Sequence, residues 1–300
     1  MYISFNVPLK AWVAHLWKDV ALITLYSGLI YILFTKFGFE TIAIPLSVPT
    51  VLGTAISIFL GFRNNSAYNR WWEARKIWGA IVNDSRTLIR QAMGFIPDEF
   101  SGKKTAVKAM AFKRIAWCYA LKNSLRKLPF EPELETYLTP DEMAFLKRHD
   151  NIPNAILALE EKQIASVFQQ GAIDAYRFAA LDSTLRRLCD AMGKCERIKN
   201  TVFPVQYSYF TRLSIYIFML LLPFGLVQAV GVFTIPITLF VVFIFSMLEL
   251  VARFLQDPFE NRPNDIPMTA VSRTIEINLL QLIGEYDVPE KIEVENDILM

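Results

Sequence analysis

The sequence predicts an all-α membrane protein with four transmembrane helices per subunit and a large helical cytosolic domain. The 300-residue chain is 53% hydrophobic, with a mean hydropathy of +0.31, yet 20% of its residues are charged. Such a balance fits a chain that lies partly in a membrane and partly in water. Charge-free runs cover residues 20–35, 41–62 and 213–248, and the charged block between the last two shows apolar residues at helical spacing.

Each of the first two runs is long enough to cross a hydrocarbon core, which needs roughly 20 helical residues at about 1.5 Å each. The third run is too long for one crossing and is interrupted by glycine and proline, so it predicts two helices joined by a turn near residues 229–234. The predicted organisation is a cytosolic N-terminus (1–18), transmembrane segments 19–38 and 41–62, a cytosolic helical domain (63–212), transmembrane segments 213–230 and 234–252, and a cytosolic C-terminal segment and tail (253–300).

The second transmembrane segment continues without a loop signal into a basic, aromatic and helix-compatible stretch, residues 63–79. The pattern predicts one helix that leaves the membrane and extends into water. A single-pass anchor gains nothing obvious from such an extension, whereas a protein that shapes a path from bilayer to cytoplasm does. Function is therefore expected along this helix.

Charge predicts the orientation, because segments flanked by Lys and Arg stay cytoplasmic. Residues 63–212 carry 24 Lys and Arg against 16 Asp and Glu. Both termini and the central block are then predicted to face the cytoplasm of a multi-pass inner-membrane protein, and no cleavable signal is evident. Three cysteines without tight spacing fit a reducing compartment, and a net charge of +2 is too small to indicate nucleic-acid binding.

Residues for enzyme chemistry are sparse. His15 and His149 are far apart in the sequence, and neither has a cysteine or carboxylate at metal-ligand spacing. There is no phosphate-binding glycine loop and no nucleophile elbow. We predict no catalytic residues, no metal and no cofactor. Glu249 precedes Arg253 by four residues, which predicts an ion pair at the cytoplasmic boundary.

Two strips of residues follow the second transmembrane segment at four-residue intervals. One consists of small residues suited to close helix packing, and the next face carries a largely apolar set: Gly53, Ser57 and Gly61, then Thr54, Ile58 and Phe62. If copies of this helix pack around an axis through the small strip, the second strip forms a narrow apolar throat that closes by dewetting. Periodicity alone favours an ordinary helix buried against its own subunit.

The chain resembles bacterial bestrophin homologues. The resemblance rests on three stretches in the right order: Gly61-Phe62-Arg63-Asn64-Asn65 with Arg70-Trp71-Trp72-Glu73-Ala74-Arg75 and Trp78-Gly79; Cys195-Glu196-Arg197-Ile198 with Thr201, Pro204 and Tyr207; and Asp257-Pro258-Phe259 with Asn264-Asp265-Ile266-Pro267. Val202 departs from the family, where a proline is usual.

The resemblance implies a homopentameric ion channel with a hydrophobic neck and a second, cytosolic aperture. The resemblance implies that the neck is formed by Thr54, Ile58 and Phe62, the strip already found by periodicity. This agreement favours the interpretation of the strip as an apolar throat over that of an ordinary helix buried against its own subunit. The aperture is expected within residues 169–174, at Ile173 or, second, Ala172. Animal relatives bind calcium through a dense acidic run that is missing from residues 257–265 here, so calcium gating is not expected.

The identity of the permeant ion follows less directly from the sequence and the resemblance. Bacterial members of the family are associated with monovalent cations, and a neck with one aromatic ring per subunit offers few positive ring edges to an anion. We therefore predict conduction of small monovalent cations such as sodium. The alternatives are a chloride channel of the same architecture and a membrane-tethered helical scaffold or sensor. The predicted partners are further copies of the chain, membrane lipid and the permeant ions. A secondary transporter is disfavoured because the charge-free runs that form the first three spans contain no Asp, Glu, Lys or Arg.

Overall fold

The chain folds into two compact units that share one long helix. The computed structural model describes residue 1 and residues 9–201, 205–295 and 297–299, with side chains from Leu16 onward in the first helix. The apolar unit comprises residues 9–70 and 205–256, and the polar unit comprises residues 1, 71–201, 257–295 and 297–299. Residues 2–8 of the predicted N-terminal segment, and Val202 and Pro204 of the family motif, lie outside the described residues.

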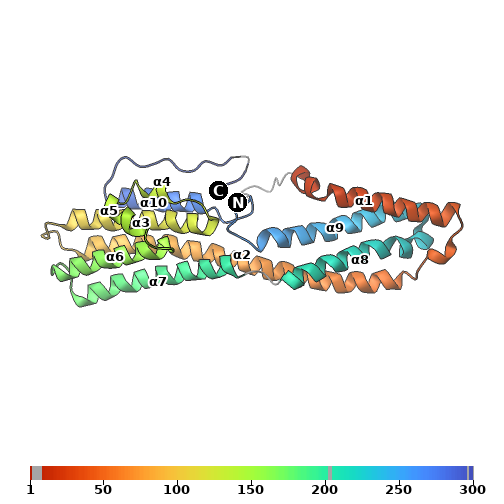
Figure 1. The fold of residues 1–300 in the computed structure, drawn as a ribbon, viewed down its shortest axis with the longest axis horizontal. Helices are drawn as coiled ribbons and strands as arrows, with labels where there is room; N and C mark the ends of the chain where they lie inside the picture. Colours follow the sequence, from red (N-terminus) through yellow and green to blue (C-terminus); the bar gives the residue numbers. More distant parts are fainter. Residues whose placement is uncertain (2–8, 202–204, 296, 300) are drawn as a thin grey trace. The chain divides into compact units, whose positions relative to one another are not determined.

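The apolar unit is built from α1 (Leu9–Lys36), the first part of α2 (Ser47–Phe95), α8 (Val205–Val230) and α9 (Thr234–Leu255). Figure 1 shows α1 and α8 running beside α9, which packs against both. Two single-turn helices lie in its connections, η1 (Glu40–Ile42) and η2 (Gly231–Phe233). The second occupies the turn that the sequence places between the last two apolar helices.

Three segments of the described chain are long and apolar enough to cross a membrane: Leu16–Lys36, Glu40–Phe95 and Val205–Leu255. The third spans 51 residues and contains both α8 and α9, as the predicted division of the long charge-free run requires. The helix of the second segment begins at Ser47 rather than at residue 41, because the stretch before it contains Pro45 and only the short η1.

Helices α2 and α8 approach each other closely near the start of α2. A Cβ atom added to Gly225 of α8 would lie 2.6 Å from Cγ of Pro49 in α2. Only glycine permits this approach. The backbone N–H of Ile44 also donates to the carbonyl of Phe224 at 3.2 Å. The start of α2 is thereby held against α8.

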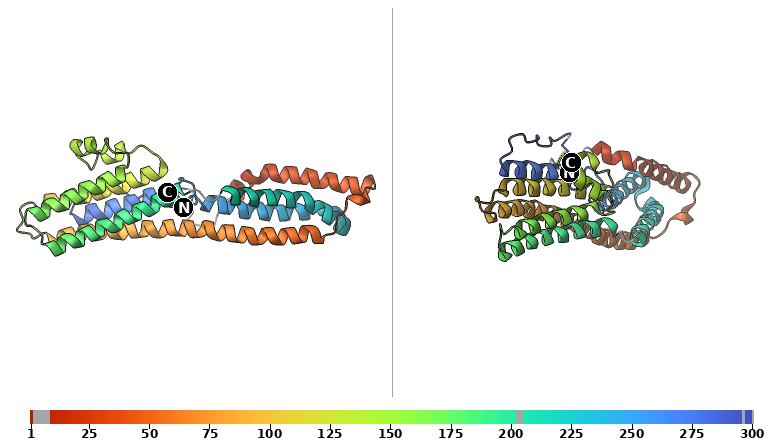
Figure 2. Two further views of the ribbon diagram at one scale, coloured as in Figure 1. Left: turned by 60° about the horizontal axis from the view of Figure 1, so that its bottom comes forward. Right: turned by 60° about the vertical axis from the view of Figure 1, so that its left-hand side comes forward.

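The polar unit is a helical bundle around a core of aliphatic and aromatic residues. Its helices are the remainder of α2, α3 (Lys103–Arg126), α4 (Glu131–Leu134), α5 (Pro140–Leu146), α6 (Ile152–Gln169), α7 (Ala175–Asn200) and α10 (Met268–Leu282). Helix α3 packs on α6 and α10, and α6 packs on α7; Figure 2 shows the bundle in two further views. Trp78 and Trp117 are fully buried in this core.

Local sequence signals begin and end these helices. Thr139 accepts the N–H of Glu142, whose carboxylate accepts the N–H of Thr139, so α5 begins with the predicted capping box. Asp174 caps α7 by accepting the N–H of Arg177 at 2.8 Å. Gly171 has φ +72°, which separates α6 from α7 in the predicted place.

The polar unit also buries charge. Arg114 and Glu160 form an ion pair at 2.9 Å with side chains 0% and 2% exposed. Burial raises the pKa of Glu160 to about 7, against the opposing effect of Arg114 and Lys113. Nearby, Tyr119 and Tyr137 donate to the carboxylate of Glu276, and burial raises the pKa of both phenols.

The Glu160→Gln variant is expected to reduce the pH dependence of stability. The folded carboxyl binds its proton more tightly than an ordinary Glu, so this group lowers stability as the pH rises from about 4.5 to about 7. The loss is on the order of 3 kcal/mol when deprotonation is complete. Melting midpoints measured in detergent between pH 5 and pH 8 should therefore fall less steeply in the variant. The exposed Glu135→Gln is the control, and an unchanged slope in Glu160→Gln would contradict the assignment.

Candidate functional site

Helix α2 presents two opposite faces in the apolar unit. Ile56, Leu60, Arg63 and Ala67 are each at most 2% exposed, and they recur at the four- and three-residue spacing of one helix face. Thr54, Ile58 and Phe62, the predicted neck, lie on the other side of the helix, as the 3.6-residue repeat requires. All three are exposed in the chain, Ile58 by 57% and Phe62 by 64%.

The neck face is more apolar than its residue types suggest. The hydroxyl of Thr54 donates to the carbonyl of Thr50 at 2.9 Å, one turn back in the same helix. Its methyl group is thus the part left for contact with a neighbouring molecule. Two large hydrophobic side chains follow it at intervals of one turn.

The small strip lies on the flank between these two faces, and its members differ in environment. A Cβ atom on Gly53 would lie 3.0 Å from the ring of Phe218 in α8, so Gly53 packs against its own chain. Ser57 is exposed, with its hydroxyl bonded to the carbonyl of Gly53 at 2.8 Å. A Cβ atom on Gly61 would meet no described atom within 4 Å. Ser57 and Gly61 therefore offer a shallow, uncovered surface next to the neck face.

A buried ion pair fixes the rotation of α2. Arg63, the residue after Phe62, donates from Nη1 to Oε1 of Glu249 in α9 at 3.1 Å, and the two side chains are 1% and 6% exposed. The neighbouring Asn64 donates to the carbonyl of Leu248 at 3.1 Å. These bonds hold one turn of α2 against α9, so the neck face is directed away from the rest of its own chain.

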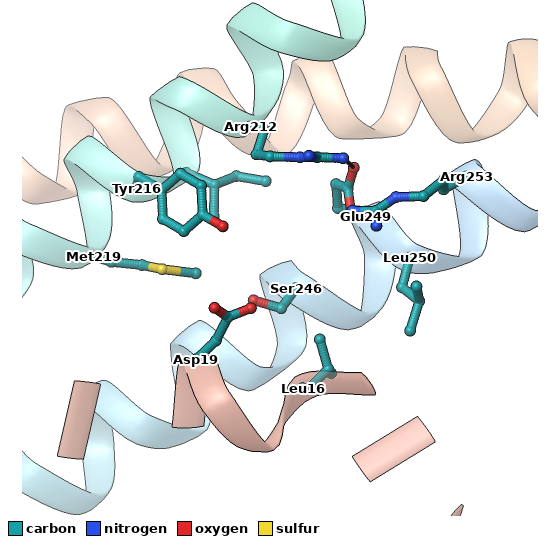
Figure 3. Close-up of a pocket in the computed structure, with 10 residues that line it drawn as sticks. Leu16, Asp19, Arg212, Tyr216, Met219, Ser246, Glu249, Leu250 and Arg253 are labelled. Carbon is teal, nitrogen blue, oxygen red and sulfur yellow. Dashed lines mark hydrogen bonds and ion pairs between the residues drawn. The ribbon is translucent and has the colours of Figure 1, made fainter. Parts of the chain in front are cut away.

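Glu249 is the centre of a larger basic cluster. It also pairs with Arg253, as the four-residue spacing predicts, and with Arg212 of α8 at 3.4 Å. Three guanidinium groups thus surround one carboxylate. Figure 3 shows Arg212 and Arg253 on either side of Glu249, above a cavity that Asp19 and Ser246 border from the opposite side. The cavity measures about 160 Å³.

The sequence does not predict the pairing of Arg63. The arginines Arg63, Arg70 and Arg75 are spaced for contacts with Glu73 of the same helix and with partner carboxylates, but Glu73 pairs with Arg197 of α7 at 2.8 Å. The available signal was an arginine directly after a charge-free run, where a buried partner is needed. Its partner lies 186 residues away and carries no local pattern.

The predicted aperture residues lie in the turn between α6 and α7. Ala172 and Ile173 are 7% and 4% exposed and belong to the core of the polar unit. Neither side chain is available in the single chain to line a passage. The exposed members of the same turn are Gln169, Gln170, Gly171 and Asp174.

These features define a class of protein: an all-helical membrane protein whose long second apolar helix leaves one hydrophobic face uncovered. Comparison with known proteins identifies the family. The family model for bacterial and fungal bestrophin proteins matches residues 9–281, so the chain belongs to this family.

Individual relatives agree with this assignment. The chain is 34% identical over 259 residues to the voltage-dependent anion channel-forming protein YneE of Escherichia coli K12, covering 86% of this chain and 83% of the relative. It is 34% identical over 238 residues to the voltage-dependent anion channel-forming protein RSc3414 of Ralstonia nicotianae, covering 79% and 76%. The crystal structure of a bacterial bestrophin homolog from Klebsiella pneumoniae superposes with a TM-score of 0.84 at 31% identity, over 89% of this chain and 98% of that one.

Removing the carboxylate of Glu249 should destabilise the apolar unit strongly. Glu249→Gln leaves Arg63 buried without its charge partner, and such uncompensated charges cost about 3–5 kcal/mol. The melting midpoint in detergent should fall clearly, and the double variant Arg63→Met with Glu249→Gln should recover part of the loss. The exposed pair Arg186–Asp182 supplies the control, because Asp182→Asn should cost less than about 1 kcal/mol. An unaltered midpoint in Glu249→Gln would exclude the anchoring role.

Proposed function

We propose that the chain is one subunit of a homopentameric channel in the bacterial inner membrane that conducts small monovalent anions such as chloride. The observation that carries this proposal is the uncovered apolar face of α2, opposite the face held by Arg63. Family membership supports a channel, and the resemblance to bestrophins supplies the subunit number. Helices α1, α2, α8 and α9 would be the four transmembrane helices, with both termini in the cytoplasm.

The neck would consist of rings of Thr54, Ile58 and Phe62 around the symmetry axis. Residues four apart in a helix are separated by about 6 Å along its axis, so three successive rings form a constriction about 12 Å long. Such a constriction offers no groups that replace an ion's hydration shell, and it conducts when it widens or wets. Ser57 and Gly61 would let adjacent copies of α2 approach closely beside it, while Gly53 packs inside its own subunit.

An anion fits better than the cation predicted from the sequence. The relatives YneE and RSc3414 are named as voltage-dependent anion channel-forming proteins. Asn65 and Asn69 continue the neck face beyond Phe62, are exposed, and carry amide N–H donors. Within Trp71–Phe95, which is described throughout, the residues of α2 classed as exposed and charged are Lys76, Arg86 and Arg90, while the carboxylate of Glu73, 43% exposed, is paired with Arg197. Basic groups along an entry path concentrate anions.

The second aperture is proposed at the turn of residues 169–174. Ala172 and Ile173 would support this turn from the core side, while the exposed Gln170 and Asp174 border the passage. This assignment differs from the prediction that Ile173 itself lines the aperture. The reason is physical: a side chain packed in its own subunit's core is not free to face a pore.

Widening the neck should raise conductance. Ile58→Ala with Phe62→Ala removes two rings of large side chains and should let the neck wet, which raises single-channel conductance in planar bilayers severalfold while the oligomer stays intact. The control is Phe59→Ala, which loses a similar volume about 100° round the helix, where Phe59 contacts Tyr207. Equal currents in all three proteins would reject the neck, and silent liposomes with a tightly bound partner protein would favour a scaffold.

Ion selectivity is tested by reversal potentials under a sodium chloride gradient. The wild-type protein should reverse near the chloride equilibrium potential. Asn65→Asp places a carboxylate from each subunit on the neck face and should move the reversal potential toward that of sodium. Ser66→Asp adds the same charge one residue further on, about 100° round the helix, and should shift it less. A wild-type reversal near the sodium potential would overturn the anion assignment.

A further inference from the structure

An open cavity in the polar unit brings two arginines together without a carboxylate. The cavity lies between α2 and α10 and measures about 430 Å³. Arg86 and Arg90 line it from α2, and Asn278, Gln281 and Leu282 line it from α10. The three- and four-residue spacing places each set on one face of its helix. None of these lining residues is acidic.

The positive charge of the two arginines is not balanced within the described part of the chain. Both side chains are exposed. Arg86 donates from Nε and Nη2 to Oδ1 of Asn278, a neutral acceptor, at 2.9 Å for Nε. The side chain of Arg90 forms no hydrogen bond or ion pair among the described residues. Because like charges four residues apart destabilise a helix, this pair calls for a negative charge from outside the chain.

Nearby carboxylates do not supply this charge. Each of them has a basic partner of its own: Asp84 with Arg187, Glu276 with Arg273, and Glu285 with Lys108. The two arginines of the cavity therefore remain available to an anion that arrives from solution.

The donors of the cavity suit a phosphoryl group. Asn278 accepts from Arg86 with its carbonyl oxygen, which leaves its amide N–H groups without a partner among the described residues, and Gln281 is exposed. Together with the guanidinium groups, four side chains can thus donate. A phosphoryl group has three acceptor oxygens and a charge of about −1.5 to −2 at pH 7, which matches two arginines better than the two oxygens and single charge of a carboxylate.

The cavity is larger than a phosphoryl group alone requires. Its volume falls within the range of small-molecule sites, roughly 300–1,000 Å³. Leu282 is 39% exposed and offers an apolar contact beside the aliphatic stems of the arginines. The carbon skeleton of an organic phosphate fits this part of the lining.

We propose that this cavity binds a phosphate monoester of a small organic metabolite, with the phosphoryl group between Arg86 and Arg90 and the carbon skeleton against Leu282. The bound dianion would balance the two arginines and offset their mutual repulsion. Both arginines are among the basic residues proposed to concentrate permeant anions, so occupancy would also lower the conductance of the proposed channel. Binding itself does not depend on conduction.

The test is isothermal titration calorimetry of the purified oligomer in detergent, with glucose 6-phosphate, inorganic phosphate and glucose as probes. Glucose 6-phosphate should bind most tightly, inorganic phosphate more weakly, and glucose not at all. Arg90→Gln should weaken the binding of glucose 6-phosphate about tenfold, which corresponds to one charge contact of about 1.4 kcal/mol. Lowering the pH below the second phosphate pKa of about 6 should also weaken it, because the ligand then loses one charge.

Two further variants separate this site from a general effect of charge. Arg148→Gln removes an exposed arginine of the same unit outside the cavity and should bind glucose 6-phosphate like the wild type. Arg90→Lys keeps the charge but loses the planar pair of donors, so its affinity should lie between those of the wild type and Arg90→Gln.

Several outcomes would overturn the proposal. An affinity unchanged in Arg90→Gln, or no binding of glucose 6-phosphate to the wild type, would show that the arginines hold no phosphoryl group. Equal affinities for glucose 6-phosphate and inorganic phosphate would identify a free-anion site. If Arg90→Gln dissociates the oligomer in size-exclusion chromatography, a neighbouring subunit supplies the missing negative charge instead. Because calorimetry measures no ion flux, a failed titration leaves the channel proposal standing, and a silent channel leaves the binding result standing.

Discussion

The buried pair of Arg63 and Glu249 is the constraint on which the arrangement of α2 depends. An arginine 1% exposed in an apolar unit cannot leave its carboxylate without a large desolvation cost. Since Arg63 follows Phe62 directly, a rotation of α2 that buried the neck face against its own chain would break the pair. A polar contact on one side of the helix thus decides which apolar residues remain uncovered on the other.

Hydrophobicity alone does not determine which face of α2 is buried against its own chain. In a bilayer, lipid tails are as apolar as leucine, so burying Ile56 inside the chain and exposing Ile58 outside it differ little in transfer free energy. Packing and interhelical hydrogen bonds then decide the orientation. The fit of Gly225 on Pro49 and of Gly53 on Phe218 at one end, and the Arg63–Glu249 pair at the other, together fix both position and rotation.

The sequence predicts the features that depend on short-range patterns. The continuity of α2, the capping box at Thr139 and the break at Gly171 each follow from residues within one or two helical turns, and the structure confirms them. Contacts between distant residues are different. The four-residue spacing predicts the pair of Glu249 with Arg253, whereas nothing in the pattern indicates the pair of Glu249 with Arg63. An apolar residue such as Ile173 gives the same sequence pattern whether its side chain faces a core or a pore.

The sequence pattern is also a poor guide to whether the permeant ion is an anion or a cation. The neck residues are uncharged, and a hydrophobic constriction excludes ions of either sign while it is dry. The preference must therefore arise where polar groups border the path, and the neck composition, on which the cation prediction relied, carries little information about it. On the exposed side of α2 the available groups are the amides of Asn65 and Asn69 and the charge of Lys76. Amide donors and a basic group stabilise an approaching anion, while the carboxylates of Glu73 and, at the proposed aperture, Asp174 are paired with Arg197 and Arg177.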